Sequence, residues 1–116
     1  MAVNLVGGTT SASAALAFNA QTGTTYSLVA GDVNKLVTLS NASAITLTVP
    51  NGVFTTGQQI NIQQIGAGQV TVASDGTTVL TSTGATSTAP KLRAQYSAAT
   101  IVCTSSNNFT VIGDLS

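Results

Sequence analysis

Apolar and polar residues alternate with a period of two along much of the chain, most clearly in residues 35–50. Every second residue of 45–49 is Ile, Leu or Val, and the residues between them are threonine. This alternation is typical of a strand with one buried face, because successive side chains of a strand point to opposite sides. A second β-prone run occupies 36–39, and Asn41-Ala42-Ser43 separates the two runs. We therefore predict a pair of strands joined by a turn.

Similar short runs follow at intervals of roughly ten residues, separated by Gly, Asn, Ser or Pro. The runs at 60–63 and 69–72 flank Gly66-Ala67-Gly68 and predict a hairpin with a glycine-containing loop. The runs at 99–103 and 109–112 predict a second hairpin. Further strands are expected at 26–29, 79–80 and 91–96.

The strand expected at 91–96 would turn Leu92 and Tyr96 into the core and Lys91 and Arg93 toward solvent. No segment shows a convincing amphipathic helical pattern. Strands at this spacing predict an all-β fold, and we expect a small antiparallel β-sandwich or barrel of about eight short strands.

The first part of the chain has a different composition from the rest. Residues 1–17 are rich in Gly, Ser, Thr and Ala and follow neither the strand nor the helix period. We predict an extended N-terminal arm at 1–17 and one β-rich module at 18–116, since 116 residues suffice for a single domain with a small core. An arm of this kind would become ordered mainly through contact with a neighbouring molecule, and a frayed terminus without a role is the alternative.

Charge is scarce and balanced. The chain holds three Lys or Arg, three Asp, no Glu and no His, so charged residues make up 5% of the sequence against about 25% in typical domains. Its polar surface must be built mainly from neutral side chains, among them 32 Ser and Thr. A surface with little net charge favours self-association. Three cations are too few for a nucleic-acid footprint, so no nucleic-acid partner is expected.

The residue types needed for catalysis are largely missing. A Ser or Cys nucleophile needs a neighbouring base, and the chain has no His and no Glu. Asp32, Asp75 and Asp114 each lie beside glycine or in a turn, where local hydrogen bonding by Asp is expected. Cys103, the single cysteine, is predicted to be a buried thiol. We expect no enzyme activity, no cofactor and no metal, although a calcium site built from one Asp and carbonyl groups stays open.

No apolar stretch approaches the roughly 18 residues of a membrane span, so no membrane partner is expected. The N-terminus lacks the basic and apolar regions of a signal peptide. We therefore expect synthesis in a cytoplasm without secretion.

Four stretches resemble a module that recurs in virion proteins of tailed bacteriophages: FNAQTGTTYSLVAGDVNKLVTLSNASAITLTVPNG, GQQINIQQIGAGQVTV, KLRAQYSAATIV and FTVIGDL. Together they span most of the chain from Phe18 to Leu115. The module occurs in capsid decorations, head fibres and tail fibres, and the resemblance implies a β-rich, trimeric virion protein without catalytic residues.

The resemblance leads to two hypotheses. The first is a homotrimeric capsid decoration (cement) protein on the capsid exterior, made in the bacterial host cytoplasm, which binds and stabilises the shell of major capsid protein. The second is a tail-fibre or baseplate-associated module that binds a host surface glycan. Under the first, the apolar residues of the arm and its junction are the candidate contacts with the capsid or another protomer: Val3, Leu5, Val6, Leu16 and Phe18.

Overall fold

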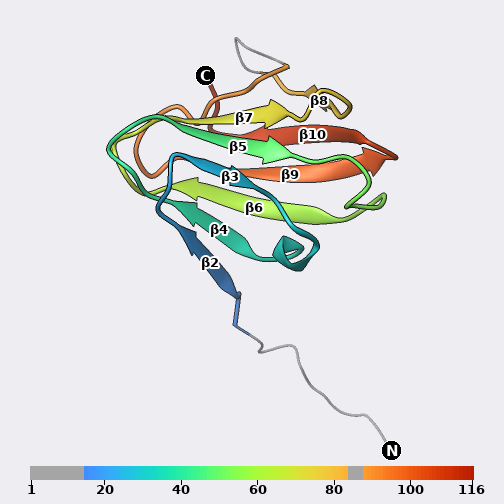
Figure 1. The fold of residues 1–116 in the computed structure, drawn as a ribbon, viewed down its shortest axis with the longest axis horizontal. Helices are drawn as coiled ribbons and strands as arrows, with labels where there is room; N and C mark the ends of the chain where they lie inside the picture. Colours follow the sequence, from blue (N-terminus) through green and yellow to red (C-terminus); the bar gives the residue numbers. More distant parts are fainter. Residues whose placement is uncertain (1–14, 84–87) are drawn as a thin grey trace, which may run out of the picture.

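The computed structural model describes residues 15–83 and 88–116, and this part of the chain is almost entirely β-structure (Figure 1). A short 3-10 helix, η2 (Ala30–Asp32), is the single helical element among the described residues. The strands are β2 (Phe18–Gln21), β3 (Thr25–Ser27), β4 (Leu36–Leu39), β5 (Ile45–Val49), β6 (Gln59–Gln64), β7 (Val70–Ser74), β8 (Val79–Thr81), β9 (Ala98–Ser105) and β10 (Asn108–Gly113).

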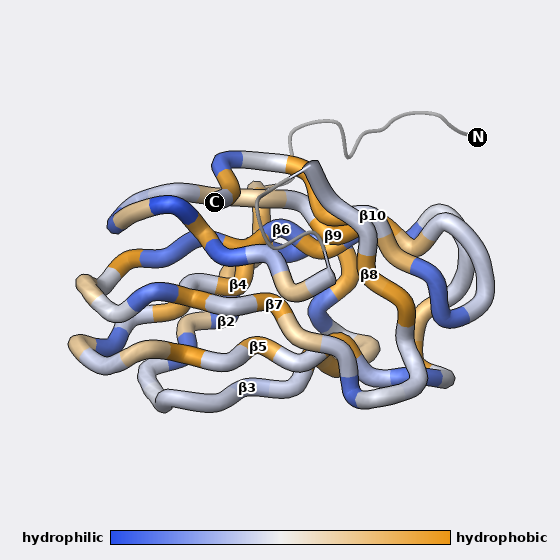
Figure 2. Tube along the Cα trace, turned by 90° about the horizontal axis from the view of Figure 1, so that it is seen from above, coloured by the Kyte–Doolittle hydropathy of each residue, from blue (hydrophilic) through white to orange (hydrophobic). Residues whose placement is uncertain are grey.

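The first six of these strands wind as a β-solenoid. They alternate between two sheets, so that β2, β4 and β6 are parallel neighbours in one and β3, β5 and β7 are parallel neighbours in the other. Each coil therefore gives one strand to each sheet: β2 and β3 form coil 1, β4 and β5 coil 2, and β6 and β7 coil 3 (Figures 1 and 2). The stacked coils enclose one core between the two sheets.

The C-terminal strands extend only the first of these sheets. Strand β9 pairs antiparallel with β6, β10 pairs antiparallel with β9, and β8 joins β10 in parallel. The result is a six-stranded mixed sheet in the order β2-β4-β6-β9-β10-β8, facing the three-stranded parallel sheet. In the three-stranded sheet, the edge of β7 is covered by the segment around Pro90 and Leu92, which exchanges backbone hydrogen bonds with Val72 and Val70 at 2.8 and 2.9 Å.

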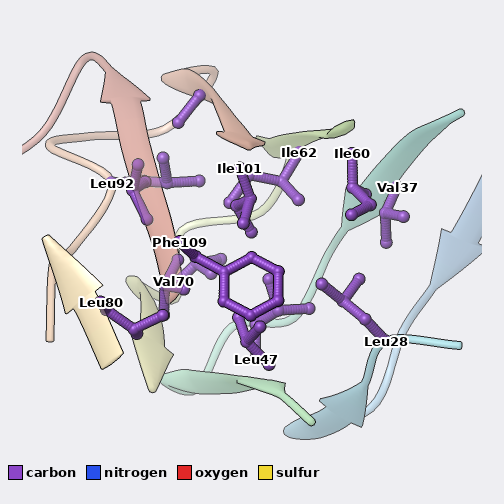
Figure 3. Close-up of a cluster of buried hydrophobic side chains, with 14 of the residues drawn as sticks. Leu28, Val37, Leu47, Ile60, Ile62, Val70, Leu80, Leu92, Ile101 and Phe109 are labelled. Atoms are coloured by element: carbon purple, nitrogen blue, oxygen red, sulfur yellow. The ribbon is translucent and has the colours of Figure 1, made fainter. Parts of the chain in front are cut away.

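The core consists of the inward residues of this alternation. Val37 and Ile62 lie side by side in the register of the six-stranded sheet, and Leu47 and Val72 do so in the opposite sheet. All four are completely buried. Figure 3 shows the ring of Phe109 among aliphatic side chains that include Leu47 and Ile101. The edge-to-face contact of this ring with Phe54 has a centroid separation of 6.1 Å. The branched side chains that favour strands also fill the core.

The all-β class is confirmed, but the two facing sheets are one mixed and one parallel sheet with a solenoid winding, and the expected antiparallel pairing is wrong for β2 to β7. Residues 36–39 and 45–49 are strands, yet they lie in different sheets and do not pair. The hairpin expected at 60–72 is likewise absent, because β6 and β7 also belong to opposite sheets. The final hairpin is confirmed as β9 and β10. Period two reports which face a side chain takes, and it does not report the partner strand.

The strand predicted at 91–96 is also wrong. Only Lys91 and Leu92 make isolated bridges there, and a turn follows. Leu92 is buried as expected, whereas Tyr96 is 63% exposed and not in the core. Its backbone has φ of 71°, which breaks the extended conformation that the alternation assumed.

Three corners on one side of the solenoid stack closely. The Asn41 side chain donates to the carbonyl of Thr22 in the first corner at 2.8 Å, and the Asn41 carbonyl accepts from Gly68 N in the third at 2.8 Å. A Cβ at Gly66 would lie 2.7 Å from the Asn41 backbone, and one at Gly68 would overlap the carbonyl oxygen of Ser43. Because Gly66 and Gly68 have no Cβ, the backbone of the third corner can lie directly against the backbone of the second corner. The corners can therefore keep the same spacing as the paired strands.

We predict that Gly68→Ala lowers the free energy of unfolding by about 2 kcal/mol or more, because the added methyl must push apart two backbone segments. Gly31→Ala is the matched control, since a Cβ there meets nothing within 4 Å and φ is not positive. Urea unfolding followed by circular dichroism measures both. Equal stability of the two variants would show that the corners are not tightly stacked.

Candidate functional site

The outer face of the six-stranded sheet is the surface to which the predicted contact residue Phe18 belongs. The strand register places five residues in one row across neighbouring strands, pointing away from the core: Phe18, Leu36, Asn61, Thr100 and Ile112. A second row holds Ala20, Thr38, Gln63 and Ala98, and a third holds Gln59, Val102, Thr110 and Thr81. We call these three rows the outer sheet face.

The outer sheet face carries no charged side chain in any of its three rows. Phe18 is 64% exposed and Ile112 60% exposed, so large apolar side chains mark the two ends of the first row. Leu36 in the first row and Val102 in the third row are half-buried. A neutral, partly apolar face of this kind is suited to contact with another macromolecule.

A shallow depression of about 230 Å³ lies in the first row, where Leu36 and Ile112 flank Asn61 and Thr100. The Thr100 hydroxyl donates to Asn61 Oδ1 at 2.8 Å, so the depression combines apolar sides with a hydrogen-bonded polar pair. Gly113 lies at its border with φ of 156°, and a Cβ there would come within 2.5 Å of Ala98 O. A side chain at this position would force the strands apart.

Of the other four predicted contact residues, the structure describes one, Leu16. Leu16 is 49% exposed just before β2, two residues from Phe18. Val3, Leu5 and Val6 lie outside the described residues. Sequence reasoning missed Leu36 and Ile112, because the pairing of β4 and β10 with other strands is what brings them into line with Phe18.

Coil 1 has polar side chains on the inner face of both of its strands. Asn19 and Tyr26 occupy inward positions in line with Val37 and Leu47, and they bind the carboxylate of Asp32, which is only 1% exposed. Asn19 Nδ2 donates to Asp32 Oδ1 at 2.8 Å, Tyr26 Oη to Oδ2 at 2.7 Å, and Val29 N to Oδ2 at 3.0 Å. This network closes the apolar core with fully bonded polar groups.

Burial raises the pKa of Tyr26 to about 12, and the hydrogen bond to the Asp32 carboxylate and its charge add to the effect. The neutral phenol donates to Asp32, whereas a phenolate would face the carboxylate as a second negative charge. The stabilisation from the neutral phenol is thus complete below the unfolded pKa of about 10 and is lost as pH rises from 10 through 12.

The other two aspartates also have structural partners, as expected for Asp in turns. Asp75 Oδ1 accepts from Thr77 N at 2.9 Å, and Oδ2 accepts from Asn51 N at 2.7 Å, so that these donors lower the pKa of Asp75. Asp114 binds Arg93 through two hydrogen bonds of 2.8 and 2.9 Å, which lower the pKa of this carboxyl. Each carboxylate has its own set of partners.

The remaining candidate groups from the sequence are the single thiol and the residue types that can ligate a metal. The Cys103 thiol is buried and its pKa is raised by desolvation, which disfavours the thiolate. Residues 15–83 and 88–116 contain no group of three His, Cys, Asp or Glu placed to hold a metal ion. Within the same ranges, no helix has the length and apolar character required to span a membrane.

Comparison with models of known protein families finds no match to the chain, and comparison with curated proteins finds no significant relative.

We predict that Asp32→Asn lowers the pKa of Tyr26 toward 10 but not fully to it, because desolvation, the largest cause of the shift, remains. The experiment uses a Tyr96→Phe background, so that the ultraviolet signal of phenolate formation comes from Tyr26, the remaining tyrosine. The background variant alone is the control. An unchanged Tyr26 titration after Asp32→Asn would contradict the network.

Proposed function

We propose that the chain is a non-enzymatic phage structural protein, a decoration or cement protein that binds the major capsid protein and stabilises the shell. The observation that carries the proposal is the outer sheet face, a neutral surface six strands wide with exposed Phe18 and Ile112 at the ends of one row. The phage origin rests on the sequence resemblance described above. The proposed location is the capsid exterior, after synthesis in the bacterial host cytoplasm.

The chemistry of this face is consistent with docking onto a protein shell. Burial of an exposed Phe or Ile side chain contributes about 1.5–3 kcal/mol in apolar transfer, before the cost of association. Without charged groups the face gains nothing from long-range steering, so affinity would depend on close fit. A shell offers many identical sites, and linked copies gain avidity there.

Self-association into a homotrimer is part of the proposal, and it follows from the resemblance. A neutral surface supports it, because no net charge opposes close approach of protomers.

Nucleic acid is not a proposed partner. Of the three cations, Arg93 is paired with Asp114. Lys35 and Lys91 are half-buried; Lys35 directly precedes β4, and Lys91 makes an isolated bridge with Thr71 of β7. They form no basic stripe of the kind that follows a phosphate backbone.

We predict that the double variant Phe18→Thr, Ile112→Thr binds shells of the co-encoded major capsid protein at least tenfold more weakly than the wild type. Both side chains are exposed, so its free energy of unfolding should stay within about 0.5 kcal/mol of the wild type. Copies bound per shell are counted by co-sedimentation of labelled protein. Saturation at three chains per symmetry site is expected.

The matched control is Val29→Thr, which removes an exposed apolar side chain (52% exposed) outside the outer sheet face. It should bind shells as the wild type does. Equal binding by the double variant would exclude this face as the docking surface. Binding to host cells but not to shells would instead favour the tail-fibre or baseplate-associated receptor-binding role.

A further inference from the structure

Tyr96 is the exception among residues with positive φ. Seven described residues have φ above zero; four are glycine, and two, Asn34 and Asn107, are asparagine. Glycine has no Cβ, and Asn tolerates the left-handed region through local hydrogen bonding, so these six fit their positions. Tyr96, with φ of 71°, carries a bulky side chain where that conformation is costly.

The conformational strain at Tyr96 is confined to one tight turn. Ser97 N donates to Ala94 O at 3.0 Å, which closes a four-residue turn with Gln95 and Tyr96 as its central residues. Positive φ at the third residue alone is the type II pattern, in which glycine is preferred at that place. A glycine would therefore serve the turn better than a tyrosine.

The turn is held firmly against the sheets. Tyr96 N donates to Gln64 O at 2.6 Å, and the side-chain amide of Gln63 donates to Tyr96 O at 3.1 Å. On the other side the Ser97 hydroxyl donates to Asp114 Oδ2 at 2.7 Å. Because the backbone is fixed on both sides, the ring projects from a rigid platform, which limits the entropy lost on binding.

The Tyr96 ring takes no part in core packing or in side-chain hydrogen bonding with the described residues. It is 63% exposed, and it is not among the residues that pack in the core cluster. Its hydroxyl makes no hydrogen bond with any described residue, in contrast to that of Tyr26, which donates to Asp32. A strained backbone that presents an unused aromatic side chain points to recognition.

We propose that the Tyr96 turn is a binding site for a neutral polysaccharide, which adjoins the outer sheet face and shares Gln63 of its second row. The ring would stack on the apolar face of a sugar unit. The side-chain amides of Gln63 and Gln95 already donate to Tyr96 O and Ile65 O, which leaves their oxygens to accept hydrogen bonds from sugar hydroxyls.

The surroundings favour this class of ligand over others. The nearest charged groups in sequence and network, Arg93 and Asp114, neutralise each other at 2.8 Å, so a charged polymer would gain little. The turn residues beside the ring are Ala94, Gln95 and Ser97, which lack the large apolar side chains that surround an aromatic anchor in a protein interface.

The test compares the wild type with Tyr96→Gly by affinity electrophoresis and isothermal calorimetry, using dextran and mannan as neutral probes and alginate as the acidic probe. Wild-type protein should bind dextran or mannan and not alginate. Tyr96→Gly should bind at least tenfold more weakly while its Tm is unchanged or higher, because glycine relieves the left-handed strain. Val29→Thr is the control that should bind as the wild type does.

Three results would overturn the proposal. The first is no binding of either neutral polysaccharide by the wild type, and the second is binding that Tyr96→Gly retains. The third is a lower Tm for Tyr96→Gly, which would mean that the ring stabilises the fold and is kept for that reason. Tyr96→Asn provides a second variant whose side chain suits the same φ, and it should lose binding like Tyr96→Gly.

Discussion

The fold depends on the close approach of successive coils at their corners. Parallel strands hydrogen-bond only when neighbouring backbones lie about 4.8 Å apart, and the corners between them must keep the same spacing. Gly66 and Gly68 meet this constraint in the third corner by placing backbone against Asn41 and Ser43. Asn41 joins all three corners, since it also bonds to Thr22. If the corners separated, the register that aligns the apolar rows would be lost.

A solenoid of three coils also has to close its core at both ends, and the protein does so differently at each. At the coil 1 end, inward polar side chains replace apolar ones, and Asp32 is bonded to Asn19, Tyr26 and Val29 N. At the other end, β9 and β10 continue one sheet and the segment around Leu92 covers the edge of β7. The polar coil and the C-terminal hairpin thus serve as caps.

The sequence predicted most strands and their buried faces, because period two reports burial directly. Apart from the final hairpin of β9 and β10, it did not predict how the strands pair. Asn41-Ala42-Ser43 and Gly66-Ala67-Gly68 have the composition of hairpin turns, and the same residues suit a solenoid corner, where close stacking rather than chain reversal requires them. The row from Phe18 to Ile112 had no local signal, because it is assembled by pairing between strands distant in sequence, parallel from β2 to β6 and antiparallel from β6 to β9. The predicted burial of Tyr96 was wrong for a local reason, because the left-handed backbone of Tyr96 itself ends the strand-like alternation.

The scarcity of charge has a consequence for where binding can occur. Asp32, Asp75 and Asp114 are each occupied by hydrogen bonds that shape corners or caps, and Arg93 is paired with the last of them. The outer sheet face is consequently left to neutral residues. Recognition on such a surface has to come from shape, apolar contact and neutral hydrogen-bonding groups. An exposed tyrosine on a rigid turn supplies all three at one point, and the proposed recognition would account for a strained aromatic residue there, since the other described left-handed positions are glycine or asparagine.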